Sequence, residues 1–64
     1  MTASLEVGTI VRVVDSTTCG EVRGMFIENG IVRKYLVALP DPKEPGMFEV
    51  HSVAPARVRA VELA

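Results

Sequence analysis

Cysteine, histidine and aromatic side chains are scarce in this chain of 64 residues, which has one Cys, one His, one Tyr, two Phe and no Trp. A single cysteine cannot form an internal disulfide, and no residues have zinc-finger spacing. We expect at least two of the three aromatic side chains in the core, which would leave no platform for stacking nucleic-acid bases. The sequence contains no motif for nucleophilic catalysis, because no credible general base lies next to Ser16, Thr17 or Thr18. No Gly-rich loop precedes a helix, which excludes a phosphate cradle.

Long apolar runs and an excess of one charge are also absent. No apolar stretch approaches the length of a membrane span, and residues 1–6 lack the cationic start and apolar run of a signal peptide. We therefore expect a soluble, cytoplasmic protein with Cys19 as a partly buried thiol. Seven Lys and Arg against eight Asp and Glu give a net charge of −1. Only a local basic patch could therefore attract nucleic acid.

The small size of the chain predicts association with further copies. A domain of about 60 residues buries only about 60% of its unfolded surface, so its single core is marginal. Neither a disulfide nor a zinc site can add stability here, which leaves oligomerisation. A hydrophobic content of 48% agrees, because a small barrel has little interior in which to hide it. We expect a homo-oligomer.

The clearest local signal is a hairpin around Asn29-Gly30, a pair that tolerates the positive φ angles of a type I′ turn. A two-residue turn predicts these opposite pairs: Glu28 with Ile31, Phe26 with Arg33, Gly24 with Tyr35, and Val22 with Val37. One face is then expected to form the core, with the Tyr35 ring over Gly24: Val22, Gly24, Phe26, Tyr35, Val37 and Leu39. The other face is more apolar than a solvated surface, which a partner would explain: Arg23, Met25, Ile27, Val32, Lys34 and Leu36. An ordinary mixed surface, with long side chains lying flat over it, explains this face equally well.

The remaining segments read as short strands and turns. We expect a first strand over residues 7–14, a loop over 15–20, a stiff Pro-rich loop over 40–46 and a fourth strand over 47–51. On that strand, Phe48 and Val50 lie on one side, and Glu49 and His51 on the other. A 3₁₀ turn over 52–56, with Ser52 as its cap, precedes a last strand over 57–63. The sequence predicts one all-β domain over residues 1–64, a small five-stranded SH3-like barrel; a split β-sandwich is the alternative.

Three segments resemble the plasmid-borne type II (type B) dihydrofolate reductases: Gly8–Arg12, Gly20–Gly24 and Pro45–Ala54. The resemblance implies an SH3-like barrel that assembles into a tetramer, with NADPH and dihydrofolate meeting in a central pore. Phe48-Glu49-Val50-His51 stands where the family has Val-Gln-Ile-Tyr, so Glu49, Val50 and His51 would line the pore. The family's pore lysine falls on Val13 or Val14. Four Glu49 carboxylates about 7 Å apart would repel by roughly 2 kcal/mol per pair at an effective dielectric of about 20, which disfavours anionic ligands.

Two further groups of side chains have candidate chemistry. Glu49 and His51 project from one face of a strand, and copies brought together by symmetry could complete a metal site; a solvated Glu and a lone His are the commoner interpretation. Arg57 and Arg59 share a face of the last strand, near Arg12, and could contact nucleic-acid phosphates as in Tudor-like or KOW-like barrels. Charged residues that protect sheet edges are the commoner explanation for such arginines.

The hypothesis that these observations favour is a non-catalytic SH3-like module for binding or assembly. It is expected to form a homo-oligomer or bind a protein partner through Met25, Ile27, Val32 and Leu36, without a cofactor. One alternative is an NADPH-dependent reductase with Glu49, Val50 and His51 in an oligomer pore. The other is a nucleic-acid-binding barrel that uses Arg12, Arg57 and Arg59.

Overall fold

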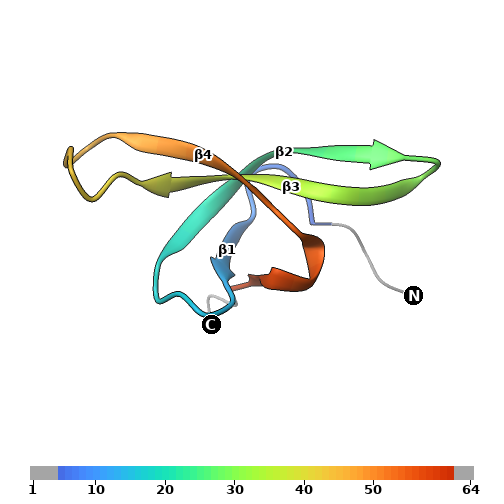
Figure 1. The fold of residues 1–64 in the computed structure, drawn as a ribbon, viewed down its shortest axis with the longest axis horizontal. Helices are drawn as coiled ribbons and strands as arrows, with labels where there is room; N and C mark the ends of the chain where they lie inside the picture. The colour runs from blue at the N-terminus through green and yellow to red at the C-terminus, as the bar shows by residue number, and fades with distance from the viewer. Residues whose placement is uncertain (1–4, 62–64) are drawn as a thin grey trace.

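Five antiparallel strands form one sheet in the computed structural model, which describes residues 5–61 (Figure 1). The strands are β1 (Ile10–Val13), β2 (Cys19–Glu28), β3 (Ile31–Pro40), β4 (Phe48–Val53) and β5 (Val58–Ala60), and a 3₁₀ turn, Pro55–Arg57, precedes the last one. Their order across the sheet is β4-β3-β2-β1-β5. The prediction of a small all-β domain with five strands and one 3₁₀ turn before the last is confirmed. Between residues 5 and 61, no helix has the length and apolar character needed to cross a membrane.

Two predicted strand boundaries in the first part of the chain were wrong. β1 begins at Ile10 and not at residue 7, because the Thr9 amide donates to the Glu6 carbonyl at 3.1 Å and closes a turn around Gly8, whose φ is +97°. β2 already begins at Cys19, where it pairs with Arg12, so the preceding loop is shorter than predicted.

The fourth strand and the 3₁₀ turn are also displaced from their predicted positions. β4 continues to Val53, so Ser52 belongs to the strand and does not cap the turn. Ala54 is the N-cap and makes no side-chain hydrogen bond to the turn. Pro55 suits the first position of the turn, because an amide hydrogen at that position would have no acceptor within the turn. β5 is short, Val58–Ala60, and residues 62–63 of the predicted strand lie outside the described residues.

The Asn29-Gly30 turn is confirmed. Both residues have positive φ angles, +53° for Asn29 and +78° for Gly30, as a type I′ turn requires. Glu28 lies opposite Ile31 at the start of the hairpin, as predicted. In Figure 1 this β2–β3 hairpin extends to the right, while the β3–β4 hairpin extends to the left.

Two bulges change the register inside the β2–β3 hairpin. Ile27 pairs with Val32, but Phe26 pairs with Lys34, so Arg33 is an extra residue in β3. Arg23 is likewise an extra residue in β2, because Val22 pairs with Val37 but Gly24 pairs with Leu36. The two bulges compensate, so the predicted Val22–Val37 pair is confirmed. Between the bulges, the predicted pairs were wrong: Tyr35 lies opposite Met25, and not opposite Gly24.

The bulge at Arg23 also decides which side chains reach the core. Val22, Tyr35 and Val37 are buried as predicted, and Leu39 packs against them. Phe26 is 60% exposed, so its predicted place in the core was wrong, and Met25 packs against the core instead. One inserted residue reverses the alternation of side chains beyond it, which moves Phe26 to the opposite face. The part of β2 that contains Phe26 also lies beyond Glu21, which is the last β2 residue paired with β1.

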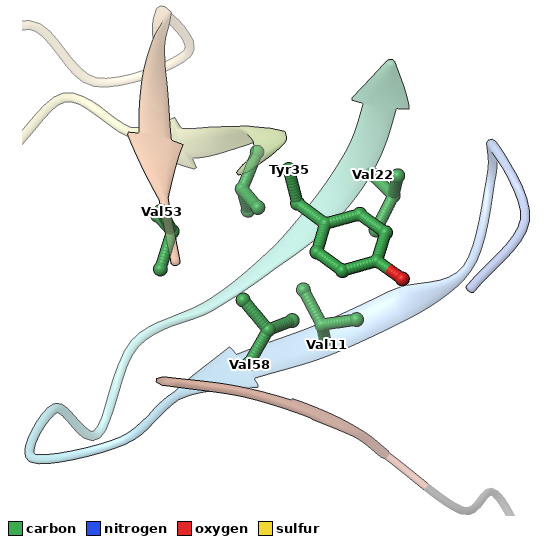
Figure 2. Packing of buried hydrophobic residues seen from close by; sticks show 6 residues of the cluster. Val11, Val22, Tyr35, Val53 and Val58 are labelled. Atoms are coloured by element: carbon green, nitrogen blue, oxygen red, sulfur yellow. The ribbon is translucent and has the colours of Figure 1, made fainter. Parts of the chain in front are cut away.

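The core is one small cluster made by all five strands. In Figure 2 the Tyr35 ring of β3 lies among valines of the other strands. The buried members of the cluster are Val11, Val22, Tyr35, Val37, Val53 and Val58. The Tyr35 hydroxyl accepts a hydrogen bond from the Leu5 amide at 3.0 Å, which ties the segment before β1 to the core.

Candidate assembly surface

The sheet has a second face, opposite the core, and cross-strand pairing shows which residues share it. Ile10 pairs with Glu21, Glu21 with Ala38, and Ala38 with Val50, so these four residues form one row across β1, β2, β3 and β4. Phe48 lies two residues from Val50 and therefore on the same face. We call the apolar members of this surface the outer-face patch: Ile10, Ala38, Phe48 and Val50.

A hollow of about 360 Å³ lies within this surface. Ala38 is only 4% exposed and forms its floor, while Ile10 and Phe48 form apolar walls. Phe48 is 63% exposed and Val50 is 58% exposed, values that are unusual for large apolar side chains in a strand. Glu21, which lies between Ile10 and Ala38 in the row, and Arg23 also line the hollow, with 3.5 Å between Oε1 and Nη1. The hollow thus combines an apolar floor with one charge of each sign.

β4 has an inverted polarity: its polar side chains lie on the core side of the sheet and its large apolar ones on the outer face. Val37 pairs with His51 and Leu39 with Glu49, which places the two polar residues on the core side of the sheet. Phe48 and Val50 therefore point to the outer face, where both are exposed. The sequence predicts the alternation correctly, but nothing in it shows which side of β4 faces the core. An edge strand that directs its apolar side to solvent is a candidate surface for association.

A second exposed apolar group lies at the tip of the β2–β3 hairpin. Phe26, Ile27 and Ile31, the hairpin-tip patch, are 60%, 61% and 55% exposed. A shallower hollow of about 320 Å³ lies beside it, and the Arg33–Glu28 ion pair at 3.3 Å borders it. Only two strands are present at this end, so its side chains have few neighbours.

The structure separates the four residues predicted to form a partner surface. Met25 and Val32 pack against the core, and Leu36 is half-buried on the outer face, opposite Gly24. Ile27 belongs to the hairpin-tip patch. The bulge at Arg23 places Leu36 on the opposite face from Met25. Ile27 stays on the same side as its partner Val32, but it lies closer to the hairpin tip and is exposed.

Glu49 and His51 are in contact, with 3.4 Å between Oε2 and Nε2 and about half of each side chain exposed. Among residues 5–61, no three metal-ligating side chains of His, Cys, Asp or Glu come together. A metal site at this pair would therefore need ligands from a further copy of the chain.

The predicted arginines are brought close together. Arg12 of β1 lies directly opposite Arg59 of β5, and both are exposed. Arg59 Nη1 donates to the Ala56 carbonyl at 3.4 Å, which fixes its guanidinium near the 3₁₀ turn. A hollow of about 530 Å³ adjoins the two side chains and is also lined by Val14, Asp15, Ser16 and Thr17. Arg57 lies in the turn itself, where its carbonyl accepts the Val14 amide at 2.7 Å.

No known protein family, curated protein or solved structure matches this chain. A functional assignment therefore depends on the geometry of its surfaces. The outer-face patch and the arginine pair are the two arrangements from which a function can be argued.

Proposed function

We propose that this chain is a non-catalytic, SH3-like assembly module that associates with copies of itself through the outer-face patch. The observation that carries the proposal is the inverted polarity of β4, which exposes Phe48 and Val50 and turns Glu49 and His51 toward the core side. Complete burial of a Phe or Val side chain is worth about 1.5–3 kcal/mol. Covering this surface would add stability that a core of mostly valines lacks.

The charges around the patch favour a second copy as the partner. In a twofold interface, the same surface is used by both molecules, so it must be complementary to itself. The outer face carries Glu21 and Arg23 side by side, with 3.5 Å between their charged atoms. A surface that carries both signs of charge is therefore compatible with a second copy of itself.

Sedimentation velocity at micromolar concentration tests this proposal with two matched variants. Phe48 and Phe26 are the two phenylalanines of the chain and are equally exposed, at 63% and 60%, but they lie on different patches. We expect the unmodified protein to sediment as a dimer or larger species, Phe48→Ser to dissociate it, and Phe26→Ser to leave it assembled. A monomeric unmodified protein contradicts self-association. Dissociation by Phe26→Ser alone would place the interface at the hairpin-tip patch.

The arginine pair favours nucleic-acid binding as a second candidate function. Like charges directly opposite each other in a sheet are destabilising, and a phosphate between Arg12 and Arg59 would relieve the repulsion. Arg57 lies nearby in the 3₁₀ turn. Binding of a labelled single-stranded oligonucleotide should then weaken steeply with added salt and be lost in Arg12→Gln. An affinity that does not change with salt would count against this function.

The reductase alternative uses the same strand, with Glu49, Val50 and His51 lining a pore between copies. Valines at positions 13 and 14 provide no cation for NADPH, and the Glu49 carboxylate is engaged by His51. These features support the non-catalytic proposal over the reductase. Titration with NADPH, followed by its fluorescence, separates the two: saturable binding would support the reductase.

A further inference from the structure

β4 is an edge strand with an accessible row of backbone groups. Within residues 5–61, it pairs only with β3. The Asp41 amide donates to the Met47 carbonyl at 2.9 Å, in the same register as the β3–β4 ladder. Because hydrogen-bonded and non-hydrogen-bonded pairs alternate, the backbone groups of Glu49, His51 and Val53 point toward β3. Those of Phe48, Val50 and Ser52 point away from it.

The position of Pro40 agrees with this alternation. Pro40 pairs with Phe48, and it has no amide hydrogen to give to the ladder. A non-hydrogen-bonded pair needs no donor at that position. The outer edge of β4 therefore presents the amide and carbonyl groups of Phe48, Val50 and Ser52 to a further strand.

We propose that β4 strands from two copies pair antiparallel about a twofold axis at Val50, which joins both sheets into one. This inference rests on the proposed self-association and specifies its geometry. Val50 would lie opposite Val50 of the other copy, and Phe48 opposite Ser52. Every outward-pointing amide and carbonyl group of Phe48, Val50 and Ser52 then forms a hydrogen bond with the other copy. A shift of the register by two residues in either direction leaves one of the three without a partner.

The charges on the core side select the same register. With Val50 on the axis, Glu49 of each copy lies opposite His51 of the other. A shift in one direction would place Glu49 opposite Glu49, and a shift in the other would place His51 opposite His51. Both side chains are at least half exposed, so they are available to a second copy. The pair that interacts within one strand would thus also connect the two strands.

The outer face gains a continuous apolar row from this arrangement. Ala38 and Val50 are cross-strand partners in each copy, so the two Val50 side chains would meet at the centre of a row that ends in Ala38 on both sides. Phe48 of each copy would lie diagonally across from Val50 of the other, within reach of an aromatic side chain. Strand pairing would thus cover part of the apolar side of β4.

Cysteine cross-linking tests the register directly, in a Cys19→Ser background that removes the native thiol. Hydrogen-bonded cross-strand residues have Cα atoms about 5.5 Å apart, which suits a disulfide. Val50→Cys should form a covalent dimer under mild oxidation. Ser52→Cys is the control: it lies on the same face of the same strand, but its equivalent in the other copy would be about 13 Å away, too far to be bridged. A mixture of Glu49→Cys and His51→Cys should cross-link, while each alone should not.

A charge exchange gives a second, non-covalent test. Glu49→Lys removes the carboxylate that would face His51 of the other copy, and we expect it to weaken dimerisation about tenfold. The double variant Glu49→Lys/His51→Glu restores opposite charges and should recover the original affinity.

The outcomes separate this inference from the broader proposal. If the Cys19→Ser protein is a dimer but Val50→Cys and Ser52→Cys cross-link equally or not at all, the β4 pairing is wrong and self-association stands. If the Cys19→Ser protein and the unmodified protein are both monomeric, both are wrong.

Discussion

Gly20 shows how a single residue limits the packing of this small core. It lies opposite Val11 in β1 and close to residues 37–39 of β3. A Cβ atom there would overlap the Ala38 carbonyl oxygen and come within 2.9 Å of Val37 Cγ1. The carbonyl belongs to the backbone and cannot move aside cheaply, so no side chain is tolerated at Gly20.

We therefore expect Gly20→Ala to lower the free energy of unfolding by about 1–3 kcal/mol, the usual cost of forcing extra atoms into a packed site. Urea denaturation followed by circular dichroism measures the change. Gly24→Ala is the matched control in the same strand, because its Cβ would lie 3.5 Å from Leu36 Cδ1, an ordinary contact. Equal losses in the two variants would show that strand propensity, and not the close approach, explains the effect.

At the scale of elements, the β2–β3 hairpin has a turn that the local sequence specifies and two bulges that it does not. Asn29-Gly30 specifies the turn by backbone preference alone, so its position follows from the sequence. The bulged residues Arg23 and Arg33 have no such signature, because an arginine in a bulge looks like any exposed arginine of a strand. The turn residues and strict alternation therefore predict the turn and the buried Val22–Val37 pair. They assign Met25 and Phe26 to the wrong faces.

The two neighbouring residues provide a test of this face assignment. Met25→Ala should cost about 2–3 kcal/mol of unfolding free energy, because Met25 packs against the core. Phe26→Ala should cost less than about 0.5 kcal/mol, because Phe26 is 60% exposed. Thermal or urea unfolding of the two variants at low protein concentration gives the comparison. A larger loss for Phe26→Ala would mean that β2 lacks the bulge.

At the scale of the whole molecule, the sheet is extended and its core is small. The chain measures 37 × 27 × 21 Å, and its two hairpins project in opposite directions (Figure 1). Among residues 5–61, the largest side chains that are completely buried are those of Val11, Val22 and Val37. Self-association through β4 and the outer-face patch would supply the burial that one copy lacks.

Assembly of this kind makes stability depend on concentration. The unfolding temperature of the unmodified protein should rise as its concentration increases, because association stabilises only the folded chain. Phe48→Ser should remove most of that dependence, since Phe48 is 63% exposed in one copy and available for contact with another. Differential scanning calorimetry over a hundredfold range of concentration checks this. A concentration-independent midpoint for the unmodified protein would argue against assembly.

The sequence by itself determined the all-β class, the number of strands, the Asn29-Gly30 turn and the alternation along β4, because these depend on backbone preferences and on neighbours along the chain. Only the tertiary structure decided which side of β4, and of β2 beyond Val22, faces the core. That choice depends on the bulges at Arg23 and Arg33 and on how far β1 extends along β2. The outer-face patch follows from the same long-range pairing, since its members come from three strands whose registers no local pattern specifies.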